Sequence, residues 1–458
     1  MIGEMRLSQI ASELGVPLPE VDVYFSRIST DSRHIEEGDL YVGLVGEYFD
    51  GNDFAEEAVR CGAVAAILSR EIPELSVPQL VVTDTLSALA ASAKLNRHKS
   101  RATVVALTGS QGKTSIKEML GTIFGRVAST LVTKANLNNT IGVPLTLLEL
   151  QEEHRFAVIE MGANAAGEIA FSVAAADPDI VLISKANAAH IEGFGSLQGV
   201  VEAKGEILDG LGANGIAILN ANDPNCDQWI ARAGNRRVRL FSYGGMVGSA
   251  DYRCSESVLT VEGRTSFRLI TPQGDVEVAL QLLGGHNAEN ALAAAACALE
   301  AGLSLDSVRE GLEMAQPVPG RLFPSIGRAG CRLLDDSYNA SPDSYKAAID
   351  VLMSSEGEKV LVAGGMRELG AMSEEAHRAV GRYAAEKGVP LLLALGPECE
   401  PLVDAFLEAG GAQAIRCEHH AELAAACEEL LSEDRVFLVK GSRGTRMDKV
   451  VSDLLAAQ

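Results

Sequence analysis

The residues best suited to chemistry lie in one stretch, 103–120, with the sequence TVVALTGSQGKTSIKEML. An apolar run of strand type leads to Gly109, Gly112, Lys113 and Thr114 and then to an amphipathic helix pattern. Glycines let backbone N–H groups surround phosphate oxygens at a helix N-terminus, a lysine there supplies a cation for β and γ phosphates, and a threonine hydroxyl can bind Mg²⁺. The stretch therefore predicts a nucleoside-triphosphate-binding loop.

The spacing within this loop is shorter than usual. Only Ser110 and Gln111 separate the two glycines, where the common phosphate loop has four residues. A glycine-rich turn with a surface lysine would use the same residue types. The strand pattern, the glycines, Lys113 and Thr114 in this order favour the phosphate loop over that alternative.

Further polar residues follow the next strand patterns. Glu160 ends FAVIEMGAN, and His190 stands in the Gly-flanked loop of DIVLISKANAAHIEGFGS. Open parallel sheets bind ligands at the carboxyl ends of their strands, where a carboxylate can hold Mg²⁺. Alone, Glu160 could be a solvated or helix-capping charge and His190 a structural histidine, but the phosphate loop upstream favours a metal role for Glu160. Lys204, between two glutamates in VEAKGEIL, has the pattern of a surface lysine.

An alanine-rich helix pattern, GGHNAENALAAAACAL, begins with His286, Asn287 and Asn290. Asn287 and Asn290 are one helical turn apart, so both amides can face one crevice, for instance an adenine edge. Capping of the helix by Asn287 explains the residue equally well.

Two polar loops follow strand patterns nearer the C-terminus. LLDDSYNASPDS contains Asp336, Tyr338 and Asn339, and VFLVKGSRGTRM contains Lys440 and Arg443. Both loops are placed to form a second ligand-binding edge of a sheet. Ordinary turn chemistry is the alternative, because Asp, Asn, Ser, Gly and Pro dominate turns.

The elements that must position these residues alternate between short β-branched strands and helices along the whole chain, which predicts an α/β fold with parallel sheets wrapped by helices. We expect a smaller N-terminal α/β domain over 1–83 and a central domain with a phosphate-loop ATPase-like parallel sheet over 84–316. A C-terminal Rossmann-like domain is expected over 317–458, after the linker sequence QPVPGR.

Composition narrows the possible partners. The 458 residues include 39 Lys and Arg against 62 Asp and Glu, a formal net charge of −23, which argues against nucleic acid and anionic membranes as partners. Charged residues near the start and the lack of long apolar runs argue against a signal peptide or membrane insertion and predict a cytoplasmic location. The 8 cysteines form no CxxC pair, so neither disulfides nor zinc are expected.

Taken together, these motifs resemble the Mur ligase family over essentially the whole chain. TGSQGKTSIKEML is similar to the shortened phosphate loop of the family, and TKANLNNTIGVPLTLL to its Asn-rich segment. EMGAN and NAAHIEGFGS resemble its metal-binding stretches, and DDSYNASPDS and KGSRGTRMD its third-domain signatures. STDSRHIEEGDLYVGLVGEYFDGNDF resembles its uridine-nucleotide-binding segment.

The resemblance implies an ATP-dependent ligase of peptidoglycan precursor synthesis, and hence of cell-wall biogenesis and cell division. The nearest member joins D-alanyl-D-alanine to the peptide carboxylate of UDP-N-acetylmuramoyl-tripeptide through an acyl phosphate, as a monomer. Alternatives within the class add a single amino acid, diaminopimelate or lysine, or add glutamate to folate. A regulatory ATPase in which hydrolysis drives domain closure is the alternative from another class.

The resemblance also implies roles for particular residues. Lys113, His190 and Lys204 are expected to be catalytic, Lys204 as a carbamate formed with CO₂. ATP is expected to bind Gly109, Ser110, Gln111, Gly112, Lys113, Thr114, Ser115, Asn290, Asp336 and Asn339. Two Mg²⁺ ions are expected, at Thr114, Glu160 and His190. The substrate is expected to contact Asp31, Ser32, Arg33, Asn138, Asn139, Arg321, Lys440 and Arg443.

Overall fold

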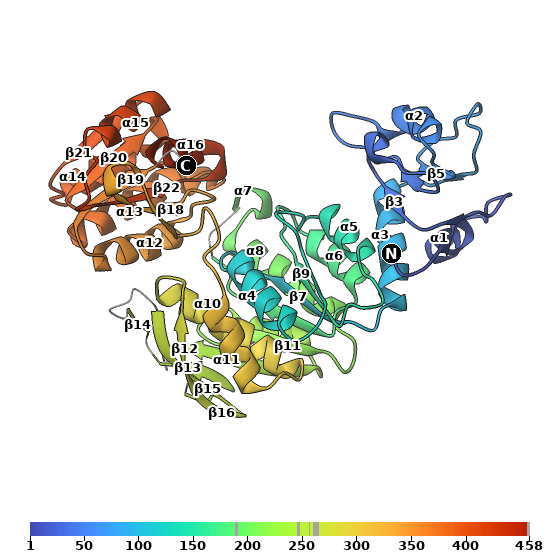
Figure 1. The fold of residues 1–458 in the computed structure, drawn as a ribbon, viewed down its shortest axis with the longest axis horizontal. Helices are drawn as coiled ribbons and strands as arrows, with labels where there is room; N and C mark the ends of the chain where they lie inside the picture. The colour runs from blue at the N-terminus through green and yellow to red at the C-terminus, as the bar shows by residue number, and fades with distance from the viewer. Residues whose placement is uncertain (188–190, 245–247, 256, 260–264, 456–458) are drawn as a thin grey trace.

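The structure, a computed structural model, describes residues 1–455 except 188–190, 245–247, 256 and 260–264. Within the described residues the strands form four separate sheets. Figure 1 shows an N-terminal unit and a C-terminal unit on opposite sides of a central unit that contains the largest sheet. No helix in the described part of the chain is long and apolar enough to cross a membrane.

The N-terminal unit is built on a small parallel sheet. Strands β4, β5 and β6 lie in the segments DLYVGL, AVAAIL and QLVVTD, and β3 completes the sheet at the β4 edge. A separate antiparallel pair, β1 and β2, flanks α1. The elements are β1 (Met5–Arg6), α1 (Leu7–Leu14), β2 (Tyr24–Phe25), β3 (Ile28–Ser29), β4 (Leu40–Val42), α2 (Ala55–Arg60), β5 (Ala65–Leu68) and β6 (Gln79–Val81).

The central sheet has the strand order β8-β9-β7-β10-β11-β12-β13-β15-β14, and β16 pairs with β15. Strands β8 to β13 pair in parallel, as the strand-helix alternation predicted. The strands are β7 (Thr103–Thr108), β8 (Thr130–Val132), β9 (Phe156–Glu160), β10 (Ile180–Ile183), β11 (Ile216–Asn220), β12 (Arg237–Tyr243), β13 (Tyr252–Cys254), β14 (Val258–Leu259), β15 (Thr265–Thr271) and β16 (Gly274–Leu280).

Helices cover both faces of this sheet because its strands are apolar on both sides. Along β7, Val104 and Ala106 pack in one cluster and Val105 and Leu107 in another, so alternate residues face opposite layers. The helices are α3 (Thr85–Lys99), α4 (Lys113–Gly125), α5 (Gly142–Leu148), α6 (Glu168–Ala176), α7 (Ile191–Phe194), α8 (Leu197–Gly205), α9 (Cys226–Ala233), α10 (Gly285–Glu300) and α11 (Leu305–Met314). Helices α10 and α11 pack against α4 on one face, whereas α5 and α6 pack against α3 on the other.

The C-terminal unit is a second sheet with the order β17-β18-β22-β19-β20-β21, parallel except for the edge strand β17. Helices lie on both of its faces (Figure 1). The elements are β17 (Phe323–Ile326), β18 (Arg332–Asp336), α12 (Pro342–Ser354), β19 (Glu358–Ala363), α13 (Ser373–Glu386), β20 (Leu391–Leu395), α14 (Glu400–Glu408), β21 (Ala414–Cys417), α15 (His420–Glu428), β22 (Arg435–Lys440) and α16 (Asp448–Leu454).

The expected α/β class and its parallel sheets are confirmed. The antiparallel extension from β13 to β16 was not expected from the sequence. The domain limits 83/84 and 316/317 stay a prediction. Helix α3, just after the first limit, packs on α1 as well as on α5 and α6, so it contacts both neighbouring units.

Candidate active site

The loop between β7 and α4 has the shape that a phosphate site requires. Gly109 and Gly112 both have positive φ angles, 152° and 81°. A Cβ atom at Gly109 would lie 1.9 Å from Ser184 Oγ, and one at Gly112 would lie 2.3 Å from Asn290 Oδ1. Glycine is therefore required at both positions by backbone conformation and by the close approach of neighbouring side chains.

Lys113 begins α4 and folds back over the loop. Its Nζ donates to the backbone oxygen of Gly109 at 2.6 Å. Burial lowers the pKa of Lys113, the nearby Glu160 carboxylate opposes that shift, and the Arg321 guanidinium adds to it. An amine buried in this loop is placed to meet an anion that enters it.

Glu160 joins the loop to the neighbouring strand end. Its Oε1 accepts from Asn138 Nδ2 at 2.8 Å and from Thr114 Oγ1 at 3.4 Å, and its backbone N–H donates to Thr133 Oγ1 at 3.0 Å. The side chain is 2% exposed, and Oε2 is buried with no hydrogen-bond partner among the residues that the structure describes. A buried carboxylate oxygen without a partner beside a threonine hydroxyl fits a Mg²⁺ ion, which prefers oxygen ligands.

Lys117 is a member of this cluster that sequence reasoning missed. It lies one turn after Lys113 on α4 and is 1% exposed. Its Nζ donates to Thr133 O at 2.9 Å, pairs with Glu118 Oε1 at 2.9 Å and lies 4.0 Å from Glu160 Oε2. A signal was present, because a lysine between the core positions Ile116 and Leu120 stands on the packed side of the helix.

Arg321, in the segment that leads to the C-terminal unit, contacts the phosphate loop. Its Nη2 donates to Thr114 Oγ1 at 2.9 Å, and its guanidinium lies 4.5 Å from the centre of the Tyr338 ring. Arg443 lies 5.3 Å from the same ring centre and is exposed. Two cations expected at the site thus stack on one aromatic ring.

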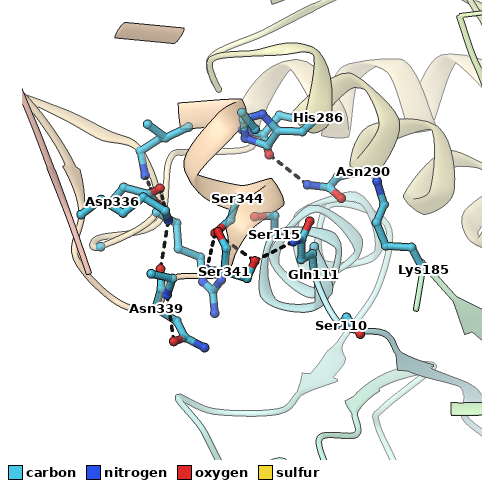
Figure 2. Close-up of a pocket in the computed structure, with 18 of the residues that line it drawn as sticks. Ser110, Gln111, Ser115, Lys185, His286, Asn290, Asp336, Asn339, Ser341 and Ser344 are labelled. Carbon is cyan, nitrogen blue, oxygen red and sulfur yellow. Dashed lines mark hydrogen bonds and ion pairs between the residues drawn. The ribbon is translucent and has the colours of Figure 1, made fainter. Parts of the chain in front are cut away.

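A cleft runs from the phosphate loop into the boundary between the central and C-terminal units, as Figure 2 shows. Lys185 and Asn290 come from the central unit, whereas Asp336 and Asn339 line the opposite side. The predicted nucleotide residues on its wall are Ser110, Gln111, Gly112, Ser115, Asn290, Asp336 and Asn339. The structure therefore brings together residues that are more than two hundred positions apart in the sequence.

The start of α10 forms one wall of this cleft. Asn290 Nδ2 donates to Asn287 Oδ1 at 3.1 Å, and Asn287 Nδ2 donates to Leu283 O at 2.9 Å. The N-cap residue of α10 is Gly284, so Asn287 lies inside the first turn and its amide does not cap the helix. Burial lowers the pKa of the neighbouring His286 to about 4, which keeps the ring neutral at physiological pH.

Two side-chain contacts close the boundary between the units. Gln111 Nε2 donates to Ser341 Oγ at 2.8 Å, and Asn187 Nδ2 donates to Asp343 Oδ2 at 2.7 Å. Figure 2 shows the first of them at the centre of the cleft. Both join loops of the central sheet to the start of α12, so a shift of the C-terminal unit would open the cleft wall.

Lys440 and Asp336 are paired with each other. Lys440 Nζ donates to Asp336 Oδ2 at 2.6 Å and to the backbone oxygen of Asn339 at 3.0 Å. Asp336 Oδ1 accepts from the backbone N–H of Leu322 at 3.1 Å. The substrate role expected for Lys440 and the nucleotide role expected for Asp336 stay predictions, and this structure shows the two groups as one buried ion pair.

Lys204 is not the surface lysine that its neighbours in sequence suggest. It is 2% exposed, and its Nζ lies 5.4 Å from the centre of the Phe194 ring. Burial, with the charge of Lys113 as a smaller cause, lowers the pKa of Lys204 to about 7. Lys204 lies on α8, and tertiary packing buries its side chain in the core. No local sequence pattern indicated this burial. His190, expected beside it, lies outside the described residues.

The residues expected to bind the UDP-sugar form a separate group in the N-terminal unit. Asp31 accepts from the backbone N–H of Arg33 at 3.0 Å and pairs with its guanidinium, which lowers the Asp31 pKa. Ser32 Oγ donates to Glu57 Oε2 at 2.8 Å. Asn138 and Asn139, also expected to contact the substrate, lie in the central unit just before α5. Asn138 reaches Glu160, and the exposed Asn139 accepts from Gly142 N at 2.8 Å.

The chain belongs to the Mur ligase family. The family model of the Mur ligase middle domain matches residues 107–298, and that of the Mur ligase glutamate ligase domain matches 320–443. The model of the Mur ligase catalytic domain matches 24–106. The resemblance stated from the sequence motifs is confirmed.

Named relatives cover nearly the whole chain. The UDP-N-acetylmuramoyl-tripeptide--D-alanyl-D-alanine ligase of Escherichia coli (strain K12) is 44% identical over 98% of both chains. The Bacillus subtilis (strain 168) ligase of the same name is 32% identical over 93% of both. The crystal structure of MurF from Acinetobacter baumannii superimposes with a TM-score of 0.89 at 36% identity, covering 99% of each chain. The Thermotoga maritima MurF ligase in complex with ADP gives a TM-score of 0.83 at 28% identity, over 93% of this chain and 96% of the other.

Proposed function

We propose that the protein is the ATP-dependent ligase that joins D-alanyl-D-alanine to the peptide carboxylate of UDP-N-acetylmuramoyl-tripeptide. The observation that carries the proposal is the cluster of Lys113, Thr114 and Glu160 beside the cleft that Ser110, Gln111 and Gly112 line. The full-length likeness to ligases of that name supports it. ATP and the tripeptide nucleotide also suggest a cytoplasmic location, where both compounds are made.

The reaction needs ATP because a carboxylate cannot form an amide directly, since oxide would have to leave. The terminal carboxylate of the tripeptide attacks the γ phosphorus, ADP leaves, and an acyl phosphate forms. The free amine of D-alanyl-D-alanine then attacks the acyl carbon. The tetrahedral intermediate expels phosphate and leaves the pentapeptide product.

This chain's own groups fit those steps. The Gly109–Ser115 loop would hold the triphosphate, and the partly buried amine of Lys113 would stabilise charge that spreads over the γ phosphate. Thr114 and Glu160 would hold Mg²⁺, which neutralises phosphate charge when bound. The Gln111–Ser341 contact across the cleft would help to exclude water from the acyl phosphate.

The lowered pKa of the buried Lys204 amine supports the expectation that this lysine forms a carbamate with CO₂. Formation of a carbamate requires a neutral amine, and a pKa of about 7 leaves much of the Lys204 amine neutral at cytoplasmic pH. Activity should therefore fall as pH drops below 7 in limiting bicarbonate, and added bicarbonate should restore part of it. A Lys204→Met variant should not respond to bicarbonate. A second Mg²⁺ beside His190 belongs to the same proposal.

Mass spectrometry of the products tests the proposed reaction. The purified chain is incubated with ATP, Mg²⁺, UDP-N-acetylmuramoyl-tripeptide and D-alanyl-D-alanine, beside a reaction that lacks the dipeptide. A new species heavier by the dipeptide minus water, together with ADP and absent from the control, is the expected result. An adduct formed only with a single amino acid would support the amino-acid-adding alternative. ADP in equal amounts in both reactions without an adduct would support the regulatory ATPase.

A further inference from the structure

Lys117 is a buried charge to which the proposed reaction gives no task. It is 1% exposed, whereas lysines are almost never fully buried unless they are paired. Its Nζ has one hydrogen bond to Thr133 O and one ion pair with Glu118, whose side chain is 46% exposed. Neither contact compensates a buried unit charge well, because the first partner is neutral and the second is half in water.

The third neighbour of this amine is Glu160. The Lys117 Nζ to Glu160 Oε2 distance is 4.0 Å, and Oε2 is the carboxylate oxygen that has no hydrogen-bond partner in the described part of the chain. Both side chains are at most 2% exposed, so water screens their attraction little. The ammonium thus lies near the open oxygen without occupying it, at a distance that leaves this oxygen free to bind another ligand.

Thr133 forms hydrogen bonds with both Lys117 and Glu160. Its backbone oxygen accepts from Lys117 Nζ, and its Oγ1 accepts from the backbone N–H of Glu160 at 3.0 Å. Thr133 therefore fixes the positions of Lys117 and Glu160 relative to each other, even though they come from α4 and β9.

We infer that Lys117 is a positioning residue whose ammonium compensates the Glu160 charge when no metal is bound and thereby weakens the binding of free divalent cations. The inference rests on the proposed function, since it assumes that Glu160 is a metal ligand. A metal ion that arrives bound to the nucleotide is accompanied by the negative charge of the phosphates. The Lys117 ammonium therefore weakens the binding of this complex less than the binding of the free metal ion. The site would then favour a metal–nucleotide complex over the metal alone.

Metal binding to the full-length chain, measured without activity, tests this. Mn²⁺ is titrated by electron paramagnetic resonance in the absence of nucleotide, in wild type, Lys117→Met and Lys117→Gln. Removal of the charge should tighten Mn²⁺ binding roughly tenfold in both variants, because a cation close to the ligand oxygen is lost. Lys387→Met, which removes an exposed lysine of the C-terminal unit, is the matched control and should bind Mn²⁺ as wild type does.

The variants separate charge from structure. Lys117→Gln can still donate to Thr133 O, so equal tightening in Gln and Met variants assigns the effect to the charge. Unchanged or weaker Mn²⁺ binding in Lys117→Met, with only a lower melting temperature, would overturn the inference and leave Lys117 a structural residue. Glu160→Gln in the wild-type background tests the assumption beneath it. If that variant binds Mn²⁺ as wild type does, the proposed metal site itself fails.

Discussion

In two lysine–carboxylate pairs of this protein the carboxylate lies at the end of a strand, but the two pairs differ in how closely their charges meet. In the C-terminal unit, Lys440 on β22 and Asp336 on β18 meet at 2.6 Å, and backbone groups satisfy the remaining atoms. In the central unit, Lys117 Nζ and Glu160 Oε2 stay 4.0 Å apart, and this oxygen accepts no hydrogen bond from any residue that the structure describes. The first pair is closed and the second is open.

The difference shows how similar residue types can either stabilise the fold or bind a ligand. A closed pair holds two neighbouring strands and their loops together, and its charges are already neutralised. An open pair keeps a buried carboxylate oxygen available, which costs stability unless a ligand satisfies it. We therefore expect substitutions in the closed pair to lower mainly the free energy of unfolding. Substitutions around the open pair should change mainly the binding and use of metal and nucleotide.

Breaking the closed pair should have the largest effect. Lys440→Met is expected to lower the free energy of unfolding by about 3 to 5 kcal/mol, because it leaves Asp336 buried without its cation. Urea unfolding followed by circular dichroism measures this. The double variant Lys440→Met with Asp336→Asn should recover part of the loss. A change below about 1 kcal/mol in the single variant would show that the pair is not closed in solution.

Removing the cation of the phosphate loop comes next. Lys113→Ala should lower kcat by about 10²-fold or more, on the scale of losing one preorganised charge-stabilising group. The melting temperature should stay near that of wild type, because within the described residues the Lys113 amine donates to a backbone oxygen alone. Steady-state kinetics on the folded variant is the measurement. Activity within a fewfold of wild type would remove Lys113 from the mechanism.

The open carboxylate gives the third prediction. Glu160→Ala should raise the Mg²⁺ concentration for half-maximal activity by about tenfold or more, since loss of even supporting groups around a metal costs that much. The measurement is a Mg²⁺ titration at saturating ATP. Glu375→Ala serves as the comparison, because it removes an exposed carboxylate of the C-terminal unit outside the cleft and should leave the Mg²⁺ dependence unchanged. Identical titration curves for wild type and Glu160→Ala would count against the metal role.

The smallest effect is expected beside the closed pair. Tyr345 Oη lies 2.6 Å from Gly364 O and 2.8 Å from Lys440 O, and its ring lies under the Lys440 amine. Tyr345→Phe should lower the free energy of unfolding by about 1 to 2 kcal/mol, since buried carbonyl groups lose their donor. Thermal unfolding measures it, and kcat should not change. A loss of activity with unchanged stability would show that Tyr345 acts in the reaction and does not serve mainly to stabilise the fold.

Much of this organisation could be read from local sequence. The phosphate loop, Glu160 at the end of its strand and the parallel α/β sheets follow from short patterns, because strand periodicity and glycine requirements are local properties. Residues 103–120 alone predict the strand, the turn and the helix that the structure contains. The antiparallel strands β13 to β16 were missed, although β15 and β16 have seven residues each and β15 alternates between buried and less buried positions, the period of a strand.

The sequence by itself determined the elements, the phosphate loop and the family, since these depend on residue order over short distances. Only the tertiary structure decided which charges are buried and which partners they meet. Lys204 has the sequence pattern of a surface lysine, and Lys117 was not singled out from the sequence, yet both lie in the core. Burial and pairing depend on elements that are distant in the chain, so no local pattern could separate the open pair of Lys117 and Glu160 from the closed pair of Lys440 and Asp336.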